Sequence, residues 1–186
     1  MIHYFKNKKA IKDFKNKKYQ VGILSRPVPN ESKLFFSKLC SIPFSISGFV
    51  NERNTKKDIH ELIKNMLRQK IKFCSFYDKW LNDMSQICKI FCSFQEKDKI
   101  SFWLGSERGC KRFHVDMVPY RCLVTYSGQG TELLPDKAAD RNAFVDGKSN
   151  ENIIKNRSAI KYLNRWDVAI FRGGNNGILH RTPESA

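Results

Sequence analysis

The sequence lacks several features that mark large classes of proteins. It has no run of about 18 apolar residues, so it predicts no transmembrane helix. Its first 20 residues are rich in lysine and contain no continuous apolar segment of a secretory signal. It shows no internal repeat, no zinc-finger spacing and no glycine-rich loop ending in GK[ST]. We therefore expect a cytoplasmic globular protein without a P-loop nucleotide site.

Acidic residues are scarce, with 18 Asp and Glu against 34 Lys and Arg, which gives a net charge of +16. Residues 1–20 hold seven lysines and one acidic residue, so we interpret them as a basic N-terminal arm. Binding to nucleic acid or to an acidic membrane surface would explain this excess of positive charge, and so would a Lys-, Asn- and Ile-rich composition typical of an AT-rich genome. Because no stacking-aromatic motif accompanies the charge, a nucleic-acid-associated protein is only the second alternative. No membrane partner is expected.

The chain contains six cysteines, enough for three disulfides. The missing export signal indicates a reducing compartment, which favours free thiols. Cys88 and Cys92 lie four residues apart in a helical pattern. They could form a metal pair or redox switch, but two small residues on the buried side of a helix are the simpler interpretation. The remaining cysteines are Cys40, Cys74, Cys110 and Cys122.

The apolar pattern predicts one domain over 21–186, with a mainly helical part at 21–98. A short strand is expected within 19–29, and then a helix within 30–42 that is opened by Asn30 or Ser32. Residues 45–54 are expected to form a loop. Helices are predicted over 55–73 and 75–94, the first with Thr55 and Asp58 as a capping box. The second has Met and aromatic residues at spacings of three and four, which indicates core.

The pattern changes near residue 99, and 99–186 is mainly strand-like. Strands are expected within 99–106, 113–118, 120–128, 167–171 and 178–183. Helices followed by strands favour an α+β fold, or a barrel with helices packed on one face. We expect a cupin-like double-stranded β-helix with the N-terminal helices packed on it.

His114 and Asp116 begin one of these strands and are separated by one residue. Residues i and i+2 of a strand share a face, so both side chains can approach one ion. His180 follows a glycine-rich turn on another predicted strand and is the best third ligand. Two imidazoles and one carboxylate are the facial triad of non-haem Fe(II) enzymes, and Zn²⁺, Mn²⁺ or Ni²⁺ can occupy the same ligand set.

The same residues also have a structural explanation. A His-x-Asp tripeptide often arises by chance, and a buried His–Asp pair can be a plain hydrogen-bonded element. The two other histidines, His3 in the arm and His60 on a helix, are not expected to be ligands. Gly173, Gly174 and Gly177 are interpreted as turn glycines that need positive φ.

Several blocks of the chain resemble a bacterial family, domain of unknown function number 1826. They are "RFHVDMVPYRCLVTYSGQGTELLPD" at 112–136, "WDVAIFRGG" at 166–174 and "GILHRTP" at 177–183. The earlier "VGILSRPVP" at 21–29 is similar to the start of the family's domain. The resemblance covers about residues 20–186 and implies no activity by itself.

A more distant resemblance is to the Fe(II)- and 2-oxoglutarate-dependent oxygenases. "GQGTELLP" is similar to their GGxT turn, and "WDVAIF" to the strand before their distal histidine. This resemblance implies His114, Asp116 and His180 as iron ligands and 2-oxoglutarate as co-substrate. Tyr126 and Thr131 are separate candidates for contact with the co-substrate, although a strand Tyr and a turn Thr are commonly structural.

The chain departs from those oxygenases at its C-terminal end. Their co-substrate's carboxylate is held by a basic residue on a final strand, whereas this chain ends six residues after His180. Arg121 is the best substitute, with Arg172 and Arg181 as weaker candidates. For each of the three, a surface ion pair is the simpler interpretation. A missing strand would also expose a sheet edge, which can pair with a second copy.

The leading hypothesis from sequence is therefore a non-haem metal-binding protein with oxygenase activity towards an unknown small-molecule or protein substrate. A non-catalytic metal-binding or metal-handling module is the first alternative. A truncated, inactive family member is another alternative, close behind the leading hypothesis because the expected C-terminal strand is absent.

Overall fold

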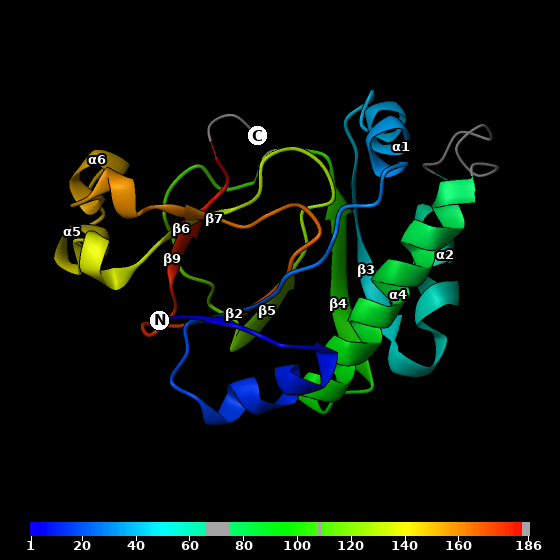
Figure 1. Cartoon of the computed structure of the whole chain (residues 1–186), viewed down its shortest axis with the longest axis horizontal. Helices are drawn as coiled ribbons and strands as arrows, with labels where there is room; N and C mark the ends of the chain where they lie inside the picture. The colour runs from blue at the N-terminus through cyan, green and yellow to red at the C-terminus, as the bar shows by residue number, and fades with distance from the viewer. Residues whose placement is uncertain (66–74, 108, 184–186) are drawn as a thin grey trace. The chain divides into compact units, whose positions relative to one another are not determined.

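The computed structural model describes residues 1–65, 75–107 and 109–183, and the statements below refer to these residues (Figure 1). The chain divides into two compact units. The strand unit comprises Met1–Pro27 and Arg108–Ala186, and the helical unit comprises Val28–Glu107. The first 20 residues, predicted to be an arm, contribute a strand and a 3-10 helix to the strand unit.

The larger sheet of the strand unit has four strands in the order β1-β2-β8-β5. They are β1 (Ile2–Tyr4), β2 (Val21–Leu24), β8 (Val168–Arg172) and β5 (Tyr120–Leu123). β1 runs parallel to β2, and the other pairs are antiparallel. The two central strands are almost fully buried, which explains their continuous apolar sequences.

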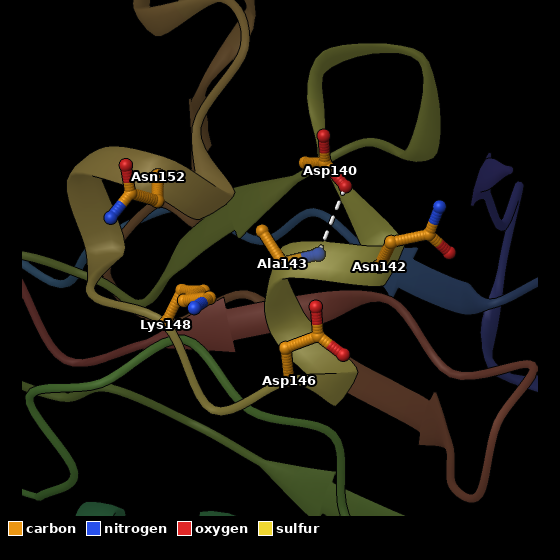
Figure 2. A pocket seen from close by; sticks show the side chains of 6 residues that line it. All are labelled: Asp140, Asn142, Ala143, Asp146, Lys148 and Asn152. Atoms are coloured by element: carbon orange, nitrogen blue, oxygen red, sulfur yellow. Dashed lines mark hydrogen bonds between the residues drawn. The ribbon is translucent and has the colours of Figure 1, made fainter.

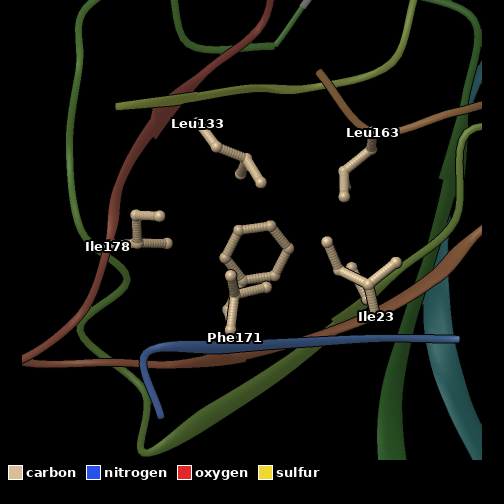
Figure 3. Close-up of a cluster of buried hydrophobic side chains, with 7 residues drawn as sticks. Ile23, Leu133, Leu163, Phe171 and Ile178 are labelled. Atoms are coloured by element: carbon tan, nitrogen blue, oxygen red, sulfur yellow. The ribbon is translucent and has the colours of Figure 1, made fainter. Parts of the chain in front are cut away.

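A second sheet has three antiparallel strands in the order β7-β6-β9. They are β7 (Lys161–Tyr162), β6 (Glu132–Leu134) and β9 (Leu179–Arg181). Figure 3 shows Ile23 and Phe171 of the first sheet meeting Leu133 of the second, with Leu163 and Ile178 beside them. Each buried side chain of this kind contributes about 1.5–3 kcal/mol through removal from water. The core therefore holds the two sheets of this unit together.

The mixed helix and sheet composition confirms the α+β prediction. The cupin-like double-stranded β-helix is not confirmed, because the sheets formed by the described residues are open. The edge of this sheet at β9 is partly paired, because His180 forms a backbone bridge there with His114.

Short helices complete the strand unit. η1 (Lys8–Asn16) buries Ile11 and Phe14 and directs its lysines outward. Arg172 donates to the carbonyl oxygens of Phe14, Lys17 and Tyr19 at 2.8–3.2 Å, and thereby fixes the end of η1 to β8. The others are η3 (Asp136–Ala138), α5 (Arg141–Val145), α6 (Asn150–Ile153) and η4 (Arg157–Ala159).

The helical unit packs helices on one face of a two-stranded ribbon. Its elements are α1 (Ser32–Leu39), β3 (Ser45–Asn51), η2 (Glu52–Asn54), α2 (Thr55–Ile63), α4 (Ser75–Gln95) and β4 (Lys99–Gly105). α4 buries Phe76, Trp80, Met84 and Phe91, as the apolar spacing predicts. None of the described helices is long and apolar enough to cross a bilayer.

Two predictions for this unit are wrong. The expected loop at 45–54 is largely β3, which pairs with β4 over its whole length. The capping box of α2 does not form, because Asp58 accepts from the backbone and side-chain nitrogens of Asn51, and Thr55 bonds the Ser85 hydroxyl at 2.6 Å. α1 begins at Ser32 without a side-chain cap. α2 ends at Ile63, and 66–73 of the predicted helix lies outside the described residues.

Candidate metal site

The two predicted histidine ligands lie directly opposite each other. The His114 amide donates to the His180 carbonyl at 3.0 Å, and the His180 amide donates back at 2.9 Å. This antiparallel bridge places both side chains on one face, with ring centroids 4.4 Å apart. Residues far apart in the chain are thus brought together by backbone hydrogen bonds.

Both imidazole rings are held in the tautomer that suits metal binding. The Nδ1 atoms of His114 and His180 lie 3.0 Å from the carbonyl oxygens of Arg112 and Ile178 respectively. A carbonyl oxygen only accepts, so each Nδ1 carries the proton. In the neutral form of each ring, Nε2 then presents a lone pair, and the backbone fixes the orientation of the ring.

Asp116 supplies a buried carboxylate beside these rings. Its Oδ1 accepts from Arg121 Nε at 2.5 Å, and its Oδ2 lies 3.5 Å from His180 Nε2. This Oδ2 is buried and makes no hydrogen bond with any described residue. A buried, unpaired carboxylate oxygen costs free energy that a cation would offset.

The donor atoms of His114, Asp116 and His180 all lie within 4.8 Å of one another. In the described part of the chain, no other group of three His, Cys, Asp or Glu side chains meets the same condition. Ligands about 2.0–2.2 Å from one ion lie roughly 3–4 Å apart, so small side-chain rotations would complete such a site. The donor set and the unpaired Oδ2 therefore fit a divalent cation.

Burial keeps the second histidine neutral. Desolvation lowers the pKa of His180 from 6.5 to about 4, and the nearby His114 and Arg121 act in the same direction. The hydrogen bond to Ile178 and the Asp116 carboxylate oppose this decrease. A neutral imidazole is the form that binds metals, so no proton has to leave His180 first at neutral pH.

A glycine turn between β8 and β9 holds the His-x-Asp segment in place. The amide of Gly174 donates to the carbonyl of Asp116 at 2.7 Å, and that of Gly173 donates to Pro119 at 3.0 Å. Positive φ is predicted for Gly173, Gly174 and Gly177, but of these three only Gly174 has it. Gly173 and Gly177 are instead required by close approach of backbone carbonyls.

The three predicted co-substrate residues lie in different surroundings. Arg121 is half exposed and reaches the site through its bond to Asp116. The Tyr126 ring packs edge-to-face on Trp166 with centroids 4.8 Å apart. The carbonyl of Thr131 accepts from the Leu163 amide at 3.0 Å. Contact of any of them with a co-substrate stays a prediction.

The two weaker arginine candidates have structural partners. Arg172 binds the carbonyls at the end of η1, as described above. Arg181 forms a buried ion pair with Glu132 at 2.6 Å, and its guanidinium lies 4.8 Å from the Phe113 ring centroid. Glu132 is not predicted from the sequence, although its place opposite Arg181 follows once β6 and β9 are paired.

The histidines not expected to be ligands have aromatic partners. His3 stacks on Tyr19 with centroids 4.2 Å apart, and His60 Nδ1 lies 2.8 Å from the Tyr77 hydroxyl. Cys88 and Cys92 are free thiols on the buried side of α4. Cys40, Cys110 and Cys122 form no disulfide with a described residue either, and Cys74 lies outside the described residues.

A separate hollow on the strand unit involves none of the three candidate ligands (Figure 2). Asp140 at its rim accepts from the Ala143 amide at 3.0 Å and thereby caps α5. This carboxylate therefore has a structural role. The hollow is lined by Asp140, Asn142, Ala143, Asp146, Lys148 and Asn152.

Comparison with known families agrees with the motif blocks around the site. Residues 6–186 match the family described as "Protein of unknown function (DUF1826)". The chain belongs to this family. The match covers both units and all three candidate ligands. No curated protein and no solved structure shows significant similarity to the chain.

Proposed function

We propose that this DUF1826 protein binds one divalent metal ion through His114 Nε2, His180 Nε2 and Asp116 Oδ2, and that it is an Fe(II)- and 2-oxoglutarate-dependent oxygenase. The observation that carries the metal-binding step is the buried Oδ2, which makes no hydrogen bond with any described residue and lies beside two imidazoles with free lone pairs. Bound Fe(II) would supply the oxygen-dependent redox chemistry that side chains do not provide.

The chain's own residues would then hold and orient the reactants. The histidine bridge fixes two ligands on one side, which is typical of a triad that leaves the opposite side open for exogenous ligands. Because Oδ1 of Asp116 is occupied by Arg121, only Oδ2 is free to ligate. The half-exposed Arg121 is also the basic side chain that would attract a carboxylate co-substrate.

The oxygenase assignment rests on the more distant resemblance and on the ligand set, so the experiment separates binding from turnover. The purified chain is incubated with Fe(II), ascorbate, 2-oxoglutarate and oxygen, and succinate is measured together with the bound metal. We expect one metal ion per chain, and slow succinate formation without an added substrate. His114→Ala, Asp116→Asn and His180→Ala should lose both.

His60→Gln provides a matched control, since His60 lies in the helical unit and its described partner is Tyr77. It should keep the bound metal and the turnover. One metal per chain without succinate would refute the oxygenase and leave a non-catalytic metal module. Absence of both from the wild-type chain would refute the whole proposal.

A further inference from the structure

The ribbon of the helical unit has one face that packs inward and one that does not. Ile46, Gly48 and Val50 of β3 alternate with residues that point away from the helices. A Cβ on Gly48 would meet the Leu62 side chain, and Val50 is fully buried opposite Ile100. The outer face therefore carries the other set of β3 and β4 side chains, which includes two exposed aromatic rings.

Trp103 lies flat on this outer face. Its Nε1 donates to the Ser45 hydroxyl at 3.0 Å. A Cβ on Gly105 would lie 2.4 Å from Cζ2 of the indole, so the ring covers the place where a side chain would stand. The indole is thus fixed in orientation, while 55% of Trp103 remains exposed.

Phe49 extends the aromatic surface on the neighbouring strand. It is 60% exposed and pairs in register with Ser101, while Trp103 pairs with Ser47. The two rings are therefore diagonal neighbours, with small hydroxyl side chains between them. Lys99 adds a cation, its Nζ lying 4.3 Å from the centroid of the Phe49 ring.

We propose that this outer face of β3 and β4 binds single-stranded nucleic acid, with Trp103 stacking an unpaired base and Lys99 pairing with phosphate. Exposed aromatic rings next to cations on a sheet are the usual platform for unpaired bases, and stacking on them is tolerant of sequence. Sequence analysis gives nucleic-acid binding only as the second alternative, because the sequence shows no stacking-aromatic motif. The aromatic platform appears only when β3 is paired with β4.

Charge favours this occupant over other ligands that stack on a flat indole. The helical unit, residues 28–107, carries 13 Lys and Arg against 9 Asp and Glu, a net charge of +4 that the proposed metal site does not explain. A polyanion would gain from that charge through counterion release, whereas a neutral sugar would not. A second copy of the chain would be repelled by the same charge. Duplex DNA hides its base faces, so the platform selects unpaired strands.

Intrinsic fluorescence offers a direct test. The chain has three tryptophans, of which Trp80 and Trp166 are 0% and 4% exposed. Trp103 therefore dominates the solvent-sensitive emission. The full chain is titrated with oligo(dT) and oligo(U) of about 15 nucleotides at low salt, with fluorescence and anisotropy of a labelled strand recorded in parallel. We expect quenching that tracks binding, and affinity that falls steeply with salt. Comparison of the two oligonucleotides shows whether DNA or RNA is the preferred ligand.

Variants assign the binding to the platform. Trp103→Ala should weaken binding about 5- to 150-fold, the usual effect of losing one stacked base, while Trp103→Phe keeps most of the affinity. Leu34→Ala removes another exposed apolar side chain of the same unit and should change nothing. His114→Ala should also bind normally, which separates this inference from the proposed metal site. Circular dichroism confirms that each variant is folded.

Three outcomes would overturn the inference. The first is no binding of either oligonucleotide. The second is binding that occurs without quenching and is retained by Trp103→Ala, because lysines on another surface would then be responsible for the binding. The third is a different occupant of the platform, detected as equal quenching by a neutral oligosaccharide or as Trp103-dependent self-association in sedimentation.

Discussion

Replacement of Gly173 by alanine should weaken metal binding without touching a ligand. A Cβ at this position would lie 1.9 Å from the Val118 carbonyl oxygen and 2.6 Å from that of Asp116. Cβ atoms are essentially never found within 3.0 Å of such atoms, so the glycine turn and the His-x-Asp segment must separate by roughly 1 Å. Overpacking of this kind costs about 1–3 kcal/mol of stability. Displacement of a ligand's support weakens metal affinity about 10- to 100-fold.

The assay is calorimetric titration of the metal-free chain with Co²⁺, alongside urea unfolding of the same preparations. Gly147→Ala is the matched control, because Gly147 has φ +74° and a Cβ there would meet no atom of the described residues within 4 Å. Left-handed strain costs that variant about 1–2 kcal/mol of stability, but its metal affinity should equal that of the wild type. If Gly173→Ala binds Co²⁺ as tightly as the wild type, the turn does not position Asp116.

Three further predictions concern stability and reactivity. Glu132→Ala removes the buried carboxylate that pairs with Arg181 and should lower the free energy of unfolding by about 3–5 kcal/mol in urea titration. A loss below about 1 kcal/mol would contradict the buried pair. The metal-free chain should lose stability, on the order of 3 kcal/mol, as the pH falls from 6.5 to about 4. The reason is that the pKa of His180 is lower in the folded state, so over this range the unfolded state binds a proton that the folded state does not. The melting temperature of His180→Gln should not show this loss, and an equal pH dependence in the variant and the wild type would refute the prediction. Burial raises the pKa of Cys88 to about 12, so a thiol reagent should modify exposed Cys110 well before Cys88; equal labelling rates on peptide mapping would contradict this.

The parts of the fold that could be predicted from sequence are those whose pattern is local. The spacing of Phe76, Trp80, Met84 and Phe91 gives the buried face of α4 without any knowledge of tertiary structure. β3 could not be predicted in this way because Ser, Gly and Asn dominate its sequence, although its residues alternate between the two faces. The strand is stabilised by pairing with β4 and by burial of Val50, and neither is visible in the segment itself.

The candidate site was predictable as a set of residues but not as a geometry. Strand periodicity places His114 and Asp116 on one face, and the few histidines in the chain leave His180 as the natural third ligand. The bridge that joins the two histidines depends on long-range pairing, which no spacing rule gives. Close approach at Gly173 likewise requires knowledge of which backbone passes beside it.

Anomalous X-ray scattering from a crystal grown with Co²⁺ tests the central claim most directly. We predict one peak about 2.0–2.2 Å from His114 Nε2, His180 Nε2 and Asp116 Oδ2. Its loss in Asp116→Asn crystals would agree with the role of the unpaired Oδ2. A cobalt peak at other side chains alone, with the two imidazoles and the carboxylate not coordinated, would contradict the proposed metal site.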